Sequence, residues 1–160
     1  SCFIEQEKES LMSRSSHETP RWPEPTEKEE VLRQFESCTL PPSQFSHRQH
    51  LALGWRYLRQ YGFPQGVVKF QEQLRAYVDE VGATAKYHET ITWAYMILMN
   101  EELALRSAPD ESFESMIERR PDLLDHRSGA LSACYPRVQL DTDEAKRVLM
   151  LPRQSPSLRP

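Results

Sequence analysis

The sequence predicts an all-α protein, and we expect a single-domain helical bundle with an extended N-terminal arm and a C-terminal tail. Apolar residues recur at spacings of three and four in several long stretches, which is the period of helices that bury one face. Capping residues or glycines bracket these stretches, as they do at helix ends. No stretch shows the alternation of apolar and polar residues that is typical of a half-buried strand.

Composition divides the chain into three parts. Residues 1–25 and 151–160 are polar and rich in proline, so we expect an arm and a tail around a helical domain at 26–150. Residues 1–11 lack the basic and apolar regions of a secretory signal. We expect them to be either native or a non-native extension upstream of a start at Met12.

The first two helices are predicted from their caps. Thr26 and Ser46 are each followed three residues later by Glu or Gln, which is the capping-box pattern. The first helix is expected to run from Thr26 to about Cys38, and the second to end at Gly62. Gly54 lies on the inner face of the second helix, so another helix or a ligand is expected to approach closely there.

The later helices follow the same logic. A third is predicted over 64–81, and a fourth, the most apolar, over 85–106 as the central helix. Asp110 is the predicted cap of a short helix, and Asp141 the predicted cap of the last one. Further helical turns are expected between these two caps.

Charge, hydropathy and cysteine content exclude several functional classes. The net charge of −4 and pI near 5.8 argue against a nucleic-acid or anionic-membrane binder. The longest apolar run, residues 91–99, is too short for a membrane span, which takes about 18 apolar residues. The three cysteines form no CxxC pair, so reduced thiols and a cytoplasmic location are expected.

Three histidines are the candidate metal ligands. His47 and His50 are three positions apart on the inner face of the second helix, and His88 lies in the first turn of the fourth. Short connections favour antiparallel neighbours, so the beginnings of these two helices are expected at the same end of the bundle. The three imidazoles are therefore predicted to hold one transition-metal ion, with zinc, iron, copper and nickel all compatible.

Other polar residues complete the predicted site. Glu89 and Tyr87 are the candidate catalytic groups, Glu89 as a proton shuttle or as a carboxylate that orients a ligand. The alternatives are that Glu89 stabilises the first helical turn and that Tyr87 is a packing residue. His126 is either a fourth ligand or part of a polar turn. Four further residues are expected to line the pocket: Thr92, Tyr95, Arg48 and Lys86.

The two histidine motifs carry a resemblance. FSHRQHL at 45–51 and KYHET at 86–90 resemble segments of a family of small, predominantly helical proteins with no assigned activity. SGALS at 128–132 and EAKR at 144–147 are similar to the C-terminal part of that family, so the resemblance spans about residues 30–151. It implies that the two histidine motifs belong together, and it transfers no activity.

Two classes of function follow from these residues. Three histidine ligands would leave coordination positions open, which predicts a small metal-dependent enzyme acting on a low-molecular-weight substrate. Zinc would support a hydrolase or lyase, and iron or copper an oxidase or oxygenase. The alternative is a non-catalytic helical module with structural histidines that binds a partner helix or forms a homodimer. An anion site is also open, because two helix beginnings with Arg48 and Lys86 nearby suit a carboxylate or phosphate.

Overall fold

The computed structural model describes residues 25–153, and this part of the chain is all-helical, as predicted. It contains α-helices and short 3-10 helices, with no strand in the described range. No helix within it is long and apolar enough to cross a membrane. The predictions for the arm up to residue 24, including a start at Met12, and for the tail beyond residue 153 lie outside the described residues.

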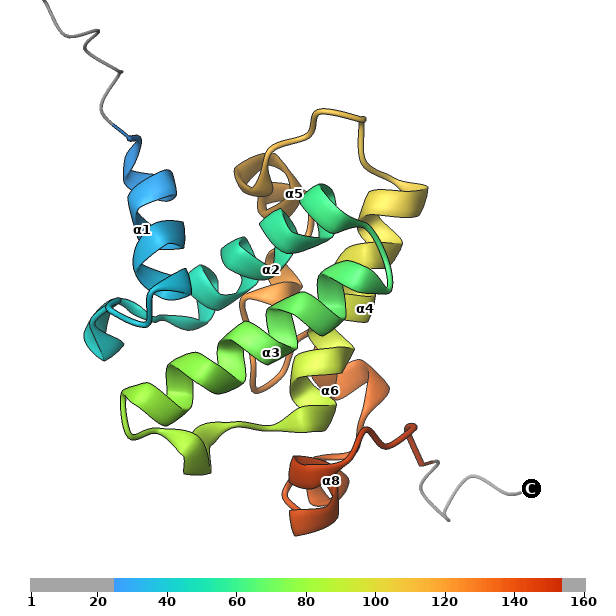
Figure 1. Cartoon of the computed structure of the whole chain (residues 1–160). Helices are drawn as coiled ribbons and strands as arrows, with labels where there is room; N and C mark the ends of the chain where they lie inside the picture. The colour runs from blue at the N-terminus through green and yellow to red at the C-terminus, as the bar shows by residue number, and fades with distance from the viewer. Residues whose placement is uncertain (1–24, 154–160) are drawn as a thin grey trace, which may run out of the picture.

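Four long helices form the body of the molecule. They are α1 (Glu27–Glu36), α2 (His47–Tyr61), α3 (Gln65–Glu80) and α4 (Glu89–Leu105). Helices α2 and α4 run in the same general direction and α3 runs in the opposite one (Figure 1). The beginnings of α2 and α4 therefore lie toward one end of the bundle, as the connection lengths predict.

Local capping explains where the first helices begin and end. The Thr26 hydroxyl accepts the backbone N–H of Glu29, whose carboxylate accepts the Thr26 N–H in return. At α2 the Ser46 hydroxyl accepts the N–H of Gln49. Gly62 follows α2 with φ at +74°, a left-handed conformation that glycine adopts without steric cost.

Helix α4 begins later than predicted. Residues Thr84–Lys86 form a separate 3-10 helix, η2, and His88 is the N-cap of α4. The apolar periodicity extends upstream of Glu89 in the sequence, but the His88 side chain caps the helix and stops it there.

Short helices make up the rest of the described chain. They are η1 (Pro42–Gln44), α5 (Phe113–Arg119), η3 (Pro121–Leu123), α6 (Ala130–Cys134), α7 (Arg137–Leu140) and α8 (Asp143–Arg147). The predicted caps Asp110 and Asp141 are wrong, because Ser112 caps α5 and Thr142 caps α8. Each of these two hydroxyls lies directly before its helix and accepts an N–H three residues on.

Helices α2 and α4 pack closely in the core. A Cβ atom added at Gly54 would lie 2.7 Å from Met96 Sδ and 3.0 Å from Met99 Cε. Because Gly54 has no side chain, α4 can pack closer to α2 than a larger residue would allow, as the position of Gly54 on the inner face predicts.

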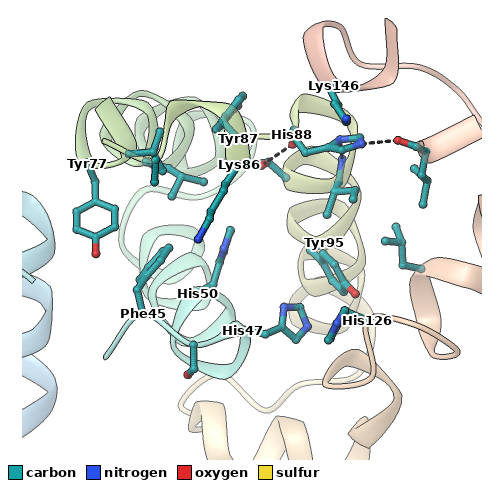
Figure 2. Close-up of a pocket in the computed structure, with 18 of the residues that line it drawn as sticks. Phe45, His47, His50, Tyr77, Lys86, Tyr87, His88, Tyr95, His126 and Lys146 are labelled. Atoms are coloured by element: carbon teal, nitrogen blue, oxygen red, sulfur yellow. Dashed lines mark hydrogen bonds between the residues drawn. The ribbon is translucent and has the colours of Figure 1, made fainter. Parts of the chain in front are cut away.

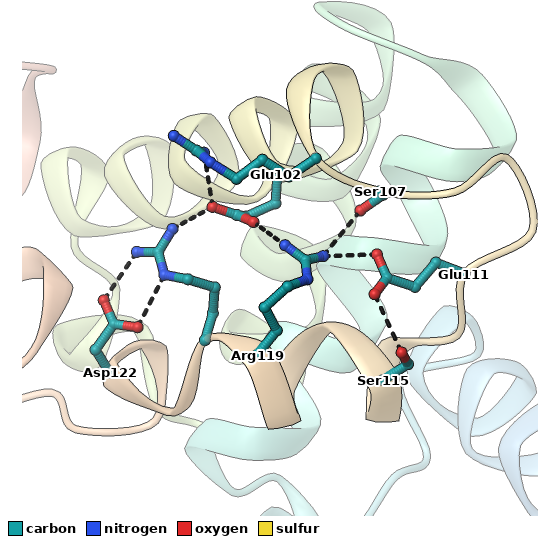
Figure 3. A network of polar contacts seen from close by, with 8 residues as sticks. Glu102, Ser107, Glu111, Ser115, Arg119 and Asp122 are labelled. Atoms are coloured by element: carbon teal, nitrogen blue, oxygen red, sulfur yellow. Dashed lines mark hydrogen bonds and ion pairs between the residues drawn. The ribbon is translucent and has the colours of Figure 1, made fainter.

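A buried carboxylate holds the end of α4 to α5 and η3 (Figure 3). Glu102 is fully buried and accepts hydrogen bonds from the guanidinium groups of Arg106, Arg119 and Arg120. Burial acts to raise the pKa of Glu102, but the bonds from Arg120 and Arg119 outweigh it, so the pKa lies below its usual value. Arg119 and Arg120 also pair with Glu111 and Asp122, respectively.

Candidate functional site

A cavity of about 730 Å³ opens between α2, α3, α4 and the C-terminal helices (Figure 2). Its walls are mostly apolar, with contributions from each of these elements. The apolar side chains that line it include Phe45, Leu74, Val78, Ile91, Leu131 and Leu140. This volume and lining are typical of a site for a small organic molecule.

All three predicted histidines line this one cavity, together with His126. His47 and His50 come from the beginning of α2, His88 from the cap of α4, and His126 from the turn before α6. The topology therefore gathers the two histidine motifs in one place, although the roles of the individual rings differ.

His88 is a capping residue whose two ring nitrogens are both engaged. Its Nδ1 accepts the backbone N–H of Ile91 at 3.2 Å, so Nε2 carries the hydrogen and donates it to the Leu140 carbonyl at 2.7 Å. No lone pair is left for a metal ion in this arrangement. In residues 25–153 no group of three His, Cys, Asp or Glu side chains is placed to hold a metal. The three-histidine centre predicted from His47, His50 and His88 is therefore not formed in the described structure.

His47 keeps one free ring nitrogen. Its Nε2 donates to the Leu123 carbonyl at 2.9 Å, so Nδ1 is an acceptor, and no described residue bonds to it. Burial lowers the pKa of His47 more than the bond to Leu123 raises it, and His126 lowers it further. The ring is therefore neutral at neutral pH. Its centroid is 4.9 Å from that of Tyr95 and 5.6 Å from that of His126.

His50 is a neutral ring among aromatic side chains. It stacks on Phe45 at 5.3 Å between centroids and contacts Phe70 at 5.4 Å. Burial, with a smaller contribution from His47, lowers the pKa of His50 to about 4. No hydrogen bond joins its imidazole to another described residue, so its donor and acceptor nitrogens are both without a protein partner within residues 25–153.

Tyr95, which lines the cavity, carries a buried hydroxyl without a hydrogen-bond partner in the described chain. Its side chain is 4% exposed and belongs to the cavity lining. Its Oη is the single buried side-chain nitrogen or oxygen atom without a hydrogen-bond partner among residues 25–153. Burial, with a smaller contribution from Asp125, raises the pKa of Tyr95 to about 12, so the hydroxyl stays protonated and is a hydrogen-bond donor.

The mouth of the cavity is cationic. Lys86, Lys146 and Arg137 line it, against a single carboxylate, Asp141. Arg137 pairs with Asp141 at 3.5 Å, with both side chains largely exposed. Neither lysine forms an ion pair with another residue in the described range, and the Lys86 side chain extends toward His50 (Figure 2). Two cationic groups are therefore free to face a ligand in a protein whose net charge is −4.

The prediction that Arg48 lines the cavity is wrong, and Glu89 and Tyr87 are hydrogen-bonded to each other. Arg48 lies outside the cavity, with its guanidinium 5.6 Å above the Phe113 ring. Glu89 is not among the residues that line the cavity. It accepts four hydrogen bonds, from Gln71, Arg75, Tyr87 and Trp93. Tyr87 lines the cavity with its ring, but its hydroxyl donates to Glu89 at 2.6 Å. These bonds favour the alternative in which Glu89 and Tyr87 are structural groups.

The other predicted lining residues are in place. Thr92, Tyr95 and Lys86 all line the cavity, and the Thr92 hydroxyl donates to the His88 carbonyl one turn earlier. Sequence reasoning missed Arg137 and Lys146. The sequence around these two residues does not distinguish them from the solvated cations that are common on short helices. Their position at the cavity depends on how the C-terminal segment packs.

The C-terminal segment is held against α4 by buried side chains. The Thr90 hydroxyl donates to the Val148 carbonyl at 2.9 Å and accepts the Met150 N–H at 3.1 Å. The Tyr135 hydroxyl donates to the Met150 carbonyl at 2.8 Å. Together with the bond from His88 to Leu140, these contacts position one wall of the cavity.

Comparisons with known proteins add no assignment: no family model, no curated protein and no solved structure matches the chain. The resemblance of the two histidine motifs to a family of small helical proteins therefore stays a prediction.

Proposed function

We propose that the protein binds a small organic anion with an apolar body in the cavity between α2, α3, α4 and the C-terminal helices. The observation that carries the proposal is one cavity with apolar walls and, at its mouth, two lysines, Lys86 and Lys146, that form no ion pair within residues 25–153. A carboxylate is the simplest group that suits this mouth, and a phosphate suits it equally.

The walls and the mouth of the cavity are expected to contribute differently to the binding free energy. Burying about 150 Å² of apolar ligand surface is worth about 4 kcal/mol. An exposed ion pair contributes at most about 1 kcal/mol. The walls therefore supply most of the affinity, and Lys86 and Lys146 select for a negative charge and orient the ligand.

The metal-dependent enzyme predicted from the sequence has weaker support. His88 spends both ring nitrogens on hydrogen bonds, which leaves His47 and His50 as the remaining members of the predicted ligand set. His126 also lines the cavity, but no three His, Cys, Asp or Glu side chains in residues 25–153 are placed to hold one metal ion. Metal-dependent catalysis on a low-molecular-weight substrate is therefore the second proposal.

Calorimetric titration with 3-phenylpropanoate and with its neutral amide tests the charge preference. We expect the carboxylate to bind the wild-type protein about tenfold more tightly, because two lysines each contribute about 0.7 kcal/mol. The double variant Lys86→Gln, Lys146→Gln should lose that preference and keep the affinity for the amide. Lys69→Gln is the matched control, since Lys69 lies over the Tyr61 ring and outside the cavity.

Two results would overturn the proposal: equal affinity of the wild-type protein for acid and amide, or binding of neither. Elemental analysis of the purified protein tests the second proposal in parallel. A transition metal bound near stoichiometry, and lost in His47→Ala, would favour the metal-dependent enzyme.

A further inference from the structure

The end of the cavity beside Tyr95 has polar groups that the cationic mouth does not explain. Tyr95, His47 and His126 gather there, away from Lys146 and His88 at the other end of the view (Figure 2). We infer that this end is a second polar subsite, which binds a hydroxyl group of the anion, so that the ligand is a hydroxyl-bearing organic acid. The inference rests on the proposed function and names the substrate class for the same cavity.

The Tyr95 hydroxyl is the first support. A buried donor without a partner costs about 1–3 kcal/mol, and folded proteins leave few such groups. The phenol here is 4% exposed, lines the cavity and finds no partner in the described chain. A ligand atom that accepts its hydrogen bond would recover that cost on binding.

The hydrogen bonds of His47 define what that ligand atom is. Because Nε2–H is committed to the Leu123 carbonyl, the free Nδ1 can only accept. The ring lies 4.9 Å from the Tyr95 ring, centroid to centroid. A donor and an acceptor side by side suit a group that both accepts and donates. A ligand hydroxyl does both, whereas a carboxylate or a ketone can only accept.

The separation of the two ends sets the length of the ligand. Tyr95 follows His88 by seven residues on α4, and a rise of about 1.5 Å per residue puts them about 10 Å apart along the helix. Lys146 lies at the His88 end (Figure 2). An acid whose carboxylate lies at Lys146 and whose hydroxyl is several bonds away spans this distance.

A matched ligand pair tests the subsite. The probes are 3-(4-hydroxyphenyl)propanoate and 3-phenylpropanoate, titrated calorimetrically into the wild-type protein and Tyr95→Phe. We expect the phenolic probe to bind the wild-type protein about tenfold more tightly, and Tyr95→Phe to remove this preference while 3-phenylpropanoate binds unchanged. Tyr57→Phe is the control, because it removes the hydroxyl of another buried tyrosine, one that is bonded to Glu36 outside the cavity.

Three other results of these titrations would contradict the subsite. Equal binding of both probes to the wild-type protein would overturn the subsite and leave the proposed function standing. An equal loss for both probes in Tyr95→Phe would also overturn it, since the hydroxyl would then serve the protein or a bound water. Binding of neither probe would overturn the proposed function, and the subsite with it.

Discussion

His88 and His47 bring the same side chain to the same cavity, and their hydrogen bonds give them opposite roles. His88 accepts at Nδ1 and donates at Nε2, so its ring closes the start of α4 and fastens the Leu140 carbonyl. His47 donates at Nε2 alone and keeps Nδ1 as a free acceptor. Which imidazole can act on a ligand is thus decided by the backbone groups around each ring.

Replacement of His88 tests its structural role. His88→Ala removes the helix cap and the bond to Leu140, so we expect the free energy of unfolding to fall by about 2 kcal/mol. His88→Asn restores a good N-cap without the bond to Leu140 and should recover about half of the loss. Urea denaturation at pH 7 measures both values.

The control for this series is His126→Ala, on an exposed turn, which should change the stability by less than about 0.5 kcal/mol. A His88→Ala protein as stable as wild type that had lost a stoichiometric metal would contradict the capping role. It would return His88 to the set of metal ligands.

Helix α4 is central and mostly apolar, yet a carboxylate anchors each of its ends. Glu89 at the start accepts bonds from side chains of α3 and from Trp93 one turn along. Glu102 near the end accepts bonds from Arg119 and Arg120, which belong to α5 and the turn after it. These carboxylates orient α4 at both ends, so the residues of its middle turns, Tyr95 among them, are presented to the cavity in a fixed direction.

The Glu102 anchor can be tested with its neighbour as control. Glu102→Gln removes the buried negative charge that three guanidinium groups share, so we expect a loss of about 2 kcal/mol in unfolding free energy at pH 7. The arginines reach solvent, which keeps the loss below that of a fully buried pair. Glu101→Gln, one position away on the exposed face, should be nearly neutral.

The free energy of unfolding should depend on pH differently in the wild-type protein and in Glu102→Gln. The pKa of Glu102 lies below its usual value of 4.5 in the folded protein, so its stabilisation is complete above pH 4.5 and is lost as the pH falls further. The difference between wild type and Glu102→Gln should therefore shrink below pH 4.5. A difference that stays constant through this window would contradict the network.

The cavity exists because a late segment of the chain folds back over the start of α4. Its walls come from α2, α3 and α4, and the remaining side is supplied by residues after Gly129, including Arg137 and Lys146. The fully buried hydroxyl of Thr90 joins the two parts through the backbone of Val148 and Met150. The cavity therefore has its last wall only when the C-terminal segment is bound to α4.

Thr90→Val tests this coupling, because valine keeps the shape and removes both hydrogen bonds. We expect a loss of about 1–2 kcal/mol in stability, faster limited proteolysis between residues 141 and 153, and weaker binding of 3-phenylpropanoate. Thr84→Val, at an exposed position with a bond to Asp79, should change none of the three. Unchanged proteolysis in Thr90→Val would contradict the anchor.

The sequence by itself determined the helices and much of their order. The caps at Thr26 and Ser46, the stop at Gly62 and the close contact at Gly54 were all predicted, because each depends on residues a few positions apart or on one helical face. Connection lengths also predicted the shared location of the histidines. The starts of α4, α5 and α8 were less accurate, since several neighbouring polar residues competed to cap each one.

Only the tertiary structure decided what the site residues do. The partner of His88 is a carbonyl 52 residues away, and Glu102 meets Arg119 across 17 residues. No periodicity encodes such pairs, because the hydrogen bonds of a side chain depend on which backbone and side-chain groups packing brings to it. The same holds for Tyr95, whose hydroxyl is buried by packing although no described residue forms a hydrogen bond with it. The sequence therefore determined where the histidines lie, and packing decided which of their nitrogens remain free.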